Sequence, residues 1–361
     1  MIVKDVRTAL LSVPYTDPPR AGYMPLERID LVVVEVETAS GVVGTGHLQP
    51  ITGGMRTLEL CIHEVLKPLL IGEEISDVPR LWRKMWDATF IQGRMGLSVM
   101  AMSALDIALW DALGRARGVP LWQLWGGRRD PVPVYGSGCY RGLGHDGMIE
   151  KAERFVAQGF AAIKMQCAHM FTADEDVANV RDMRATLGDG IEIMIDANQG
   201  WSVEEAIAVG KRFDAYELSW LEEPVMADDF EGYARIGAVI ETPLATGENN
   251  FTHRDLLPFL KGGHVAVLQP DIMRGGYTDL RIIAERAHGA GLAFAPHLFP
   301  ELSVHLNASV PNGAWLEYMG WHDHLWVEPL LPVGGMLTPT DRPGHGMDFK
   351  PELFREFAYR A

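Results

Sequence analysis

The first part of the chain carries two successive patterns of apolar and polar positions. Three stretches alternate apolar with polar residues or hold β-branched runs, which predicts strands over 2–11, 30–41 and 42–50. The last two strands meet at Ser40-Gly41, as expected of a hairpin. Apolar positions then recur at helical spacing over 55–70, 78–90 and 97–118. These elements predict an α+β unit over 1–128.

The middle of the chain, 129–320, repeats one pattern. Short apolar stretches rich in β-branched residues, the first at 132–138, alternate with longer stretches of helical periodicity. This alternation predicts a βα barrel, which takes roughly 250 residues when complete. The tail, 321–361, is rich in Pro and Gly, and we expect it to fold back over the first unit instead of extending the barrel.

Acidic residues stand at matched places in three successive repeats. Asp196, Glu222 and Glu248 each follow an apolar run, and 26 residues separate each from the next. Strand ends of a βα barrel converge on one face, so the three carboxylates are expected to share one pocket. Like charges this close would raise one another's pKa unless a cation lay between them. A hard divalent cation, one Mg²⁺ per subunit, is the predicted occupant.

Other groups able to bind a metal or transfer protons continue the series. Asp271, His297 and Glu317 end the next three apolar runs, after steps of 23, 26 and 20 residues. Upstream, Lys164 and Gln166 lie two residues apart and so face one side of a single strand. So regular a series is not expected by chance.

Composition and charge narrow the class of protein. The chain has 361 residues, of which 47% are apolar and 22% charged, as in a globular protein with a large core. A formal net charge of −16 argues against nucleic acid or an anionic membrane as a partner. Three cysteines without CxxC spacing argue against a disulfide or zinc framework. No apolar run approaches the length of a membrane span and no signal-peptide pattern occurs, so we expect a cytoplasmic enzyme with a small-molecule carboxylate substrate.

Several motifs stand in an order that resembles one known family. They are SALDIALWDALGRARGVPLWQLWGG, DANQGW, WLEEP, GEN, QPD, PHL and WLEYM, followed by PGHGMDF near the end. Over nearly its whole length the chain is similar to the enolase superfamily, in its mandelate racemase subgroup. The resemblance implies a (β/α)7β-type modified TIM barrel with an N-terminal α+β capping domain that the C-terminal tail completes. It also implies an even-numbered homo-oligomer, with an octamer as one candidate.

The resemblance implies a role for each candidate residue. It places metal ligands at Asp196, Glu222 and Glu248, a base dyad at Asp271–His297, an acid at Glu317 and a lysine at Lys164. Removing a proton α to a carboxylate puts a second negative charge on its oxygens, which Mg²⁺, Lys164 and a protonated Glu317 would stabilise. His297 can take up the proton near neutral pH, and Asp271 would fix its tautomer.

One position departs from the subgroup's pattern. The resemblance implies Lys-x-Lys on the second barrel strand, whereas this chain has Lys164-Met165-Gln166. An amide takes up no proton at physiological pH, and racemisation needs an acid/base group on each face of the substrate. Dehydration needs only His297, which can remove the α-proton and help the β-hydroxyl leave. We therefore expect a dehydratase of a sugar acid or diacid.

Several alternatives stay open. The reaction can instead be that of a racemase, an epimerase or a lactone cycloisomerase, and an inactive binding protein is the third class. Lys164 can swing in as a base, and Gln166 can serve as a contact to substrate hydroxyls.

Specificity is expected to come from the first unit, whose loops at 15–27 and 47–54 would lie over the barrel mouth. Candidate substrate contacts are Arg20, Tyr23, His47, Gln49, the pair Tyr140-Arg141, and Asn198 on the face of Asp196. Glu223 is expected on the opposite strand face from Glu222. We interpret His322-Asp323-His324 as a surface loop and not as a metal site.

Overall fold

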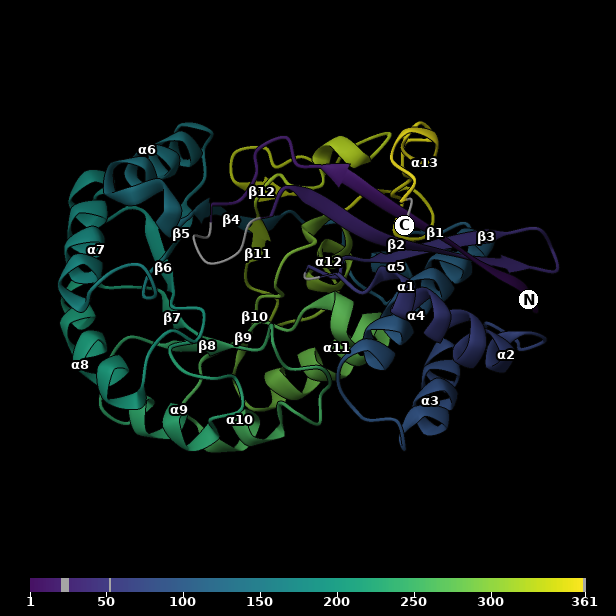
Figure 1. The fold of residues 1–361 in the computed structure, drawn as a ribbon, viewed down its shortest axis with the longest axis horizontal. Helices are drawn as coiled ribbons and strands as arrows, with labels where there is room; N and C mark the ends of the chain where they lie inside the picture. The colour runs from purple at the N-terminus through teal and green to yellow at the C-terminus, as the bar shows by residue number, and fades with distance from the viewer. Residues whose placement is uncertain (21–25, 52, 360–361) are drawn as a thin grey trace.

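Two sheets organise the chain, of which the structure, a computed structural model, describes residues 1–20, 26–51 and 53–359. The first sheet is antiparallel, with β1 Val3–Pro14, β2 Arg28–Thr38 and β3 Val43–Leu48 in that order. β2 and β3 form the predicted hairpin, in which Gly41 has a positive φ of 85° that favours glycine. In Figure 1 this sheet lies to one side of the barrel.

Helices cover one face of this sheet. They are α1 Met55–Leu60, α2 Lys67–Leu70, α3 Val78–Thr89 and α4 Leu97–Arg117, with a π-helical segment at Cys61–Leu66 and the short α5 Leu121–Leu124 after them. α4 lies directly on β3, because Gly44 and Gly46 have no side chains. A Cβ on either glycine would collide with the backbone of α4. The predicted α+β unit is therefore present.

Helix α4 differs from the prediction in one respect. It is long and apolar enough to meet the criteria for a membrane span, with a hydropathy of 1.4, although no run was expected to approach that length. However, 83% of the apolar window is buried inside the protein, where α4 contacts β2, β3 and α11 Ile272–Gly289. α4 is thus a core helix between the two sheets.

The second sheet is the predicted (β/α)7β barrel. Its parallel strands follow the order β10-β9-β8-β7-β6-β5-β4-β11. Their bounds are β4 Val132–Cys139, β5 Ala162–Gln166, β6 Glu192–Asp196, β7 Trp220–Glu222, β8 Leu244–Thr246, β9 Val267–Leu268, β10 Ala293–Phe294 and β11 Leu316–Tyr318. A bridge between Phe294 and Gly313 links β10 to the segment before β11.

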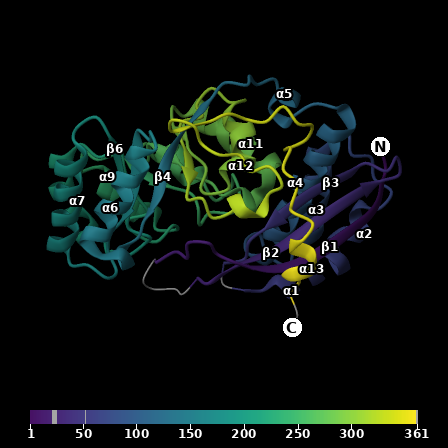
Figure 2. The ribbon, with the colours of Figure 1, turned by 90° about the horizontal axis from the view of Figure 1, so that it is seen from above.

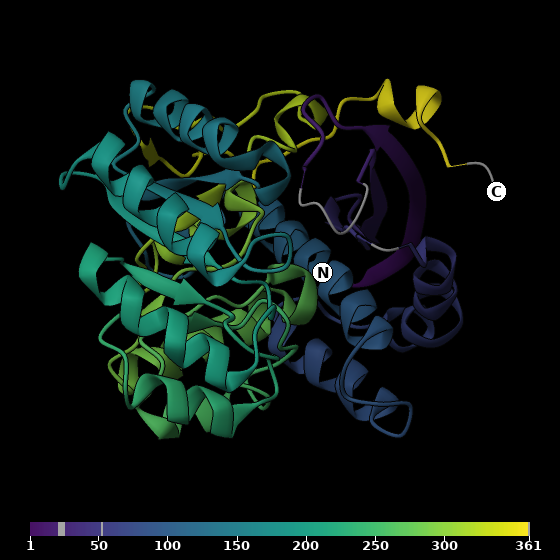
Figure 3. The same cartoon turned by 60° about the vertical axis from the view of Figure 1, so that its left-hand side comes forward.

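A helix follows each of the first seven barrel strands. These helices are α6 Gly144–Ala157, α7 Ala173–Leu187, α8 Val203–Phe213, α9 Phe230–Gly237, α10 Leu257–Gly262, α11 and α12 Pro300–Asn307. Figures 1 and 3 show α6 to α10 as an outer layer around the strands. This arrangement sends the carboxyl ends of the strands to one face of the barrel.

The tail packs on the other face of the first sheet, as predicted. Alternate residues of β2 point to opposite faces, so that Val32 and Val34 meet the helices while Leu31 and Val33 meet the tail. The tail contributes Leu325, Trp326, Met347, Phe349 and Leu353 to this second cluster. Figure 2 shows the final helix, α13 Leu353–Glu356, beside β1.

One part of the tail was predicted wrongly. The two-residue strand β12 Met336–Leu337 pairs antiparallel with β4 and so adds to the barrel sheet. The unit boundaries at residues 128 and 320 stay a prediction.

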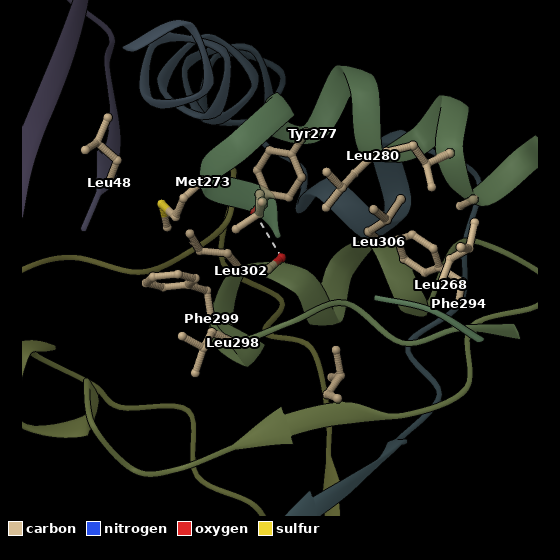
Figure 4. Close-up of a cluster of buried hydrophobic side chains, with 14 of the residues drawn as sticks. Leu48, Leu268, Met273, Tyr277, Leu280, Phe294, Leu298, Phe299, Leu302 and Leu306 are labelled. Atoms are coloured by element: carbon tan, nitrogen blue, oxygen red, sulfur yellow. Dashed lines mark hydrogen bonds between the residues drawn. The ribbon is translucent and has the colours of Figure 1, made fainter. Parts of the chain in front are cut away.

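A shared apolar cluster joins the barrel to the first unit. Figure 4 shows Leu48 of β3 in one cluster with Met273 and Tyr277 of α11 and with residues of α12. The Tyr277 hydroxyl donates a hydrogen bond of 2.9 Å to the carbonyl of Leu302. The cluster also holds Leu298 and Phe299, the two residues that follow His297. The barrel mouth and the first unit are thereby packed against each other.

Candidate active site

Asp196, Glu222 and Glu248 converge at the carboxyl ends of neighbouring strands. Asp196 is the last residue of β6, Glu222 is the last of β7, and Glu248 follows the end of β8 by two residues. The strand register places Asp196 beside Glu222. One carboxylate oxygen of each residue lies within 4.8 Å of the other two. The convergence agrees with the spacing of the three residues in the sequence.

Burial of these carboxylates works against their charged forms. Burial raises the pKa of Asp196 to about 6, with Lys164 opposing the shift and Glu248 adding to it. Burial likewise raises the pKa of Glu222 and of Glu248. A divalent cation with oxygen ligands relieves such a cluster, and three carboxylates are a donor set that suits Mg²⁺. The residues present therefore fit the predicted metal.

Lys164 of β5 lies inside the cluster. Its Nζ is 2.7 Å from Glu222 Oε1, 2.9 Å from Glu317 Oε1 and 3.9 Å from Asp196 Oδ2. Burial would lower the pKa of Lys164, but Glu222 and Glu317 outweigh that effect and hold it well above its usual value. Lys164 is therefore a fixed positive charge, which does not favour its use as a swinging base.

His297 and Asp271 form the expected pair. His297 Nδ1 lies 2.9 Å from Asp271 Oδ2, and a backbone bridge joins the two residues. The other ring nitrogen, Nε2, lies 3.2 Å from Glu248 Oε2 and 3.7 Å from Glu317 Oε2. Burial would lower the pKa of His297, but Glu248 and Asp271 outweigh it and raise the pKa to about 10. One imidazole nitrogen is thus held while the other faces the acidic cluster.

Glu317 of β11 is buried beside the cationic side chains of Lys164 and His297. Its Oε2 accepts a hydrogen bond of 3.0 Å from the backbone N–H of Leu298. Burial would raise the pKa of Glu317, but Lys164 and His297 outweigh it and lower the pKa to about 2. The structure thus favours a charged Glu317, which differs from the protonated acid that the sequence predicts.

Asn198 and Arg141 are committed to the protein. Asn198 donates from its backbone N–H to Asp196 Oδ1 and from Nδ2 to Asp196 Oδ2, both at 2.7 Å. Its Oδ1 accepts a hydrogen bond of 2.8 Å from Arg141, which is 1% exposed and also donates to the Cys167 carbonyl. Arg141 therefore orients Asn198, and Asn198 in turn orients Asp196, so a direct contact of Arg141 with substrate is not supported.

A cavity of about 440 Å³ opens above the acidic cluster. Four of the predicted substrate contacts line it, namely Gln166, Asn198, Gln49 and Tyr140, and their contact with substrate stays a prediction. Gln166 accepts a long hydrogen bond, 3.4 Å, from the backbone N–H of Arg141.

Two predicted contacts from the first unit, His47 and Arg20, lie elsewhere, and a third falls outside the described residues. His47 is 1% exposed and packs against the rings of Phe299, Trp326 and Phe349, so it does not line the cavity. Arg20 is exposed and is not among the cavity residues. Tyr23 lies outside the residues that the structure describes.

The interpretation of 322–324 as a surface loop is wrong for His322. This side chain is buried, stacks on Phe299 with ring centroids 4.9 Å apart, and bonds Gln49 Oε1 through Nε2 at 2.8 Å. Gln49 in turn donates to the Tyr15 hydroxyl at 2.8 Å. A side chain of the tail thus ties the first unit to the loop that follows His297.

The position of Glu223 was also predicted wrongly. It lines the cavity instead of the opposite strand face, because β7 ends at Glu222 and Glu223 has a φ of 37°, which breaks the alternation. Its Oε2 accepts hydrogen bonds from Gln199 at 3.0 Å and from Asn249 at 2.8 Å. Both amides follow metal-ligand candidates in DANQG and GENN, which is the only sequence signal for them.

Two donors to Glu222 were missed. Gln269 Nε2 donates to Glu222 Oε2 at 2.8 Å, and Trp220 Nε1 donates to the same oxygen at 3.1 Å. Gln269 belongs to the QPD motif two residues before Asp271, a position that points into the barrel end. Trp220 lies two residues before Glu222, on the same side of β7. Both side chains restrain the orientation of Glu222.

Comparisons with known proteins agree with this geometry. Residues 6–126 match the family model of the mandelate racemase / muconate lactonizing enzyme N-terminal domain, and residues 147–353 match the enolase C-terminal domain-like model. A 3,6-anhydro-alpha-L-galactonate cycloisomerase of Streptomyces coelicolor is 34% identical over 97% of this chain and 98% of its own. An L-talarate/galactarate dehydratase of Salmonella typhimurium is 33% identical over 92% of this chain and 83% of its own.

A solved structure of a racemase from Streptomyces coelicolor with bound magnesium has a TM-score of 0.94 and 33% identity, over 99% of this chain and 100% of that one. The similar proteins thus include dehydratases and cycloisomerases, and the fold, the acidic cluster and the two family models agree with the resemblance drawn from the sequence. The chain belongs to the mandelate racemase / muconate lactonizing enzyme family of the enolase superfamily.

Proposed function

We propose that this protein is a Mg²⁺-dependent lyase that eliminates the β-hydroxyl of a sugar acid. The carboxylates of Asp196, Glu222 and Glu248 would hold the metal. Bound there, magnesium would supply Lewis-acid stabilisation of the negative charge that develops on the substrate carboxylate when the α-proton leaves. Lys164, fixed at the same end of the cavity, adds a second positive charge next to that carboxylate.

His297 is the base in this proposal. The α-proton moves to Nε2, while Asp271 accepts the hydrogen bond from Nδ1–H and keeps the ring in one orientation. A cation held by Glu248 would weaken the pull of that carboxylate on His297 and so would lower the pKa of the imidazole from about 10. The imidazolium then returns the proton to the departing β-oxygen, the C–O bond breaks, and water leaves. The remaining enol tautomerises to a 2-keto-3-deoxy acid.

The observation that carries this proposal is the difference between the two sides of the acidic cluster. His297 follows β10 on one side, and Gln166 ends β5 on the other, with β6, β7, β8 and β9 between them. The amide of Gln166 cannot take up a proton at physiological pH, and Lys164 is held by Glu222 and Glu317. A single base suits elimination better than racemisation, which needs an acid/base group on each face.

A cycloisomerase is the second candidate. It is favoured by the 34% identity, over nearly the whole chain, to the 3,6-anhydro-alpha-L-galactonate cycloisomerase. The chemistry of this site would be the same up to the leaving group, because His297 would remove the α-proton and protonate a ring oxygen instead of a hydroxyl. The two reactions differ in whether water is released.

The test is a panel of sugar acids, with and without ring closure, incubated with Mg²⁺ in D₂O and followed by NMR. A 2-keto-3-deoxy product formed with loss of water supports dehydration. Ring opening without loss of water supports the cycloisomerase, and α-deuterium exchange into unchanged acid or its epimer supports an epimerase. No conversion, no exchange and no metal binding would leave only a binding protein.

The variant His297→Asn tests whether His297 is the base while the metal site stays intact. We expect turnover to fall by roughly 10²- to 10⁴-fold while the Kd for Mg²⁺ stays within a few-fold of wild type. His288→Asn, at an exposed position of α11, is the matched control and should keep full activity. Equal activity of His297→Asn and His288→Asn would remove His297 from the mechanism.

The proposed enzyme is cytoplasmic and forms an even-numbered homo-oligomer, with an octamer as one candidate. Exposed apolar side chains at Phe90, Ile91 and Met95, which are 51%, 85% and 60% exposed, support an interface at the segment between α3 and α4. Light scattering during gel filtration measures the assembly directly.

A further inference from the structure

The cavity has two chemically different ends. The barrel end is polar and charged, with the acidic cluster, Lys164 and His297. The end formed by the first unit is mostly apolar: Pro19, Leu26, Pro50, Ile51, Leu97 and Met100 line it, together with the polar Gln49. A substrate whose carboxylate lies at the barrel end therefore points its far end at the apolar wall.

Positive charge is confined to the barrel end. Within the described ranges, the cationic side chains that line the cavity are Lys164, Arg274 and His297. Arg274 is anchored at the end of β8, where its Nε donates to the Glu248 carbonyl at 2.6 Å and its guanidinium lies 4.8 Å from the Phe251 ring centroid. All three cations thus belong to the barrel, and Arg274 is held beside Glu248.

Among the described residues, the loops of the first unit add no cationic side chain to the cavity lining. The side chain of Arg20 is exposed and does not line the wall. Gln49, the polar side chain nearest this wall in sequence, already donates to Tyr15 and accepts from His322. A charged or heavily hydroxylated far end would find few partners among the described residues.

The charges that line the cavity also disfavour a second carboxylate on the substrate. Five carboxylates line the cavity, those of Asp196, Glu223, Glu248, Asp271 and Glu317. A second substrate carboxylate would add to this negative charge and would lose its hydration against apolar side chains, which is strongly unfavourable without a paired cation.

Building on the proposed function, we infer that the substrate is a monocarboxylate whose far end is uncharged and poor in hydroxyls. A 6-deoxy sugar acid or an anhydro sugar acid has this chemistry, and a diacid does not. The apolar wall provides the discrimination, because it contacts a methyl group or a closed ring without leaving polar groups unpaired.

The first test is a matched series of substrates that differ only at C6. For each hexonate configuration, kcat/KM is measured with Mg²⁺ for the 6-deoxyhexonate, the hexonate and the corresponding diacid. We expect the best 6-deoxyhexonate to exceed its diacid at least tenfold. A ratio below tenfold, or a preference for the diacid, overturns the inference.

The second test adds a cation to the wall. Ile51→Arg replaces a side chain that lines the cavity and is 40% exposed, so the new guanidinium can be accommodated. It should reduce the ratio of 6-deoxyhexonate to diacid at least tenfold. Ile71→Arg makes the same substitution at a similarly exposed site, 43%, away from the cavity, and should leave the ratio unchanged. A ratio that does not change with Ile51→Arg, in a protein with wild-type thermal stability, overturns the assignment of the wall.

The two levels of proposal fail differently. If no acid of any configuration is converted or exchanges its α-hydrogen in D₂O, the proposed function fails. If an acid is converted but the ratio is below tenfold, the inference about the far end alone fails.

Discussion

Replacing Arg141 with lysine should weaken magnesium binding while the positive charge stays in place. Arg141 donates from Nη2 to Asn198 Oδ1 at 2.8 Å and to the Cys167 carbonyl at 2.7 Å, and from Nε to that carbonyl at 3.1 Å. Asn198 then fixes both oxygens of Asp196. A lysine ammonium is a single point of donation and cannot reproduce the planar fork of arginine. The amide of Asn198 is therefore released, and Asp196 loses its orientation.

The expected size follows from these contacts. Loss of a group that orients a metal ligand typically weakens metal affinity about 10- to 100-fold, or about 1.4 to 2.8 kcal/mol. The free energy of unfolding should also fall by about 1 to 3 kcal/mol, because buried carbonyl groups lose their hydrogen-bond donors. Since the charge is retained, the electrostatic influence of residue 141 on the pKa of Asp196 changes little.

Arg184→Lys is the matched control. Arg184 also donates to backbone carbonyls, those of Gly188, Ile191, Tyr216 and Glu217, but it does so near the amino end of β6. Isothermal titration with Mg²⁺ and thermal unfolding are measured for both variants, and kcat is measured at saturating metal. Arg184→Lys should lower the unfolding temperature and leave the Mg²⁺ Kd unchanged.

The reasoning is refuted by one pattern of results. If Arg141→Lys lowers the unfolding temperature as Arg184→Lys does but shifts the Mg²⁺ Kd less than threefold, Arg141 only stabilises the fold. Recovery of kcat at high Mg²⁺ concentration is expected, because Arg141 acts on Asp196 through Asn198.

Three further predictions concern single positions. Gln166→Lys should raise α-deuterium exchange at least tenfold, measured by NMR in D₂O, because it restores a titratable group opposite His297; unchanged exchange would show that this side is not open to the α-carbon. Burial raises the pKa of Asp106 to about 7, although Thr278 donates hydrogen bonds to it. Between about pH 4 and 7 the folded state therefore binds one more proton than the unfolded state. The free energy of unfolding should fall by up to about 4 kcal/mol as the pH rises through that range. Asp106→Asn should flatten this dependence in denaturant titrations at pH 5 and pH 8, and an unchanged slope would contradict the assignment. Gly44→Ala should lower the free energy of unfolding by about 1 to 3 kcal/mol, because the new Cβ would meet the backbone of α4. A wild-type temperature of thermal unfolding would contradict that packing.

The acidic cluster could be predicted because its geometry depends on local spacing. Each repeat of strand and helix returns the chain to the same face of the barrel after a nearly constant number of residues. The 26-residue steps between Asp196, Glu222 and Glu248 therefore become adjacent strand ends. The same regularity places His297 after β10 and Glu317 in β11. No knowledge of distant pairing is needed for this part of the site.

Periodicity fails where a strand stops. Glu223 and Asn198 come just after β7 and β6, with positive φ values of 37° and 42°. The alternation of side chains ends there, so the opposite-face rule does not place Glu223 and the same-face rule does not describe Asn198. Such turns depend on the hydrogen bonds that follow the strand, which a pattern of apolar residues does not encode.

The contacts of the first unit could not be predicted from the sequence, for a different reason. His47 and Gln49 lie near the end of β3, in a sequence where they could equally face a substrate or the protein core. The tail decides between these two possibilities, because it brings Trp326, Phe349 and His322 into contact with them from more than 270 residues away in the sequence. Only the tertiary fold shows that His47 is enclosed by aromatic rings.

These long-range contacts couple stability to specificity. Burial lowers the pKa of His322 to about 3, so this imidazole is neutral at physiological pH and can lie flat on Phe299 while it bonds Gln49. Phe299 follows His297 by two residues, and Gln49 adjoins Pro50 and Ile51 of the apolar wall. One buried side chain of the tail therefore holds both the loop after the proposed base and the segment that would contact the far end of the substrate. A substitution that alters the packing of the first unit and tail can in this way change the contacts to the far end of the substrate, without moving the residues proposed to handle the proton.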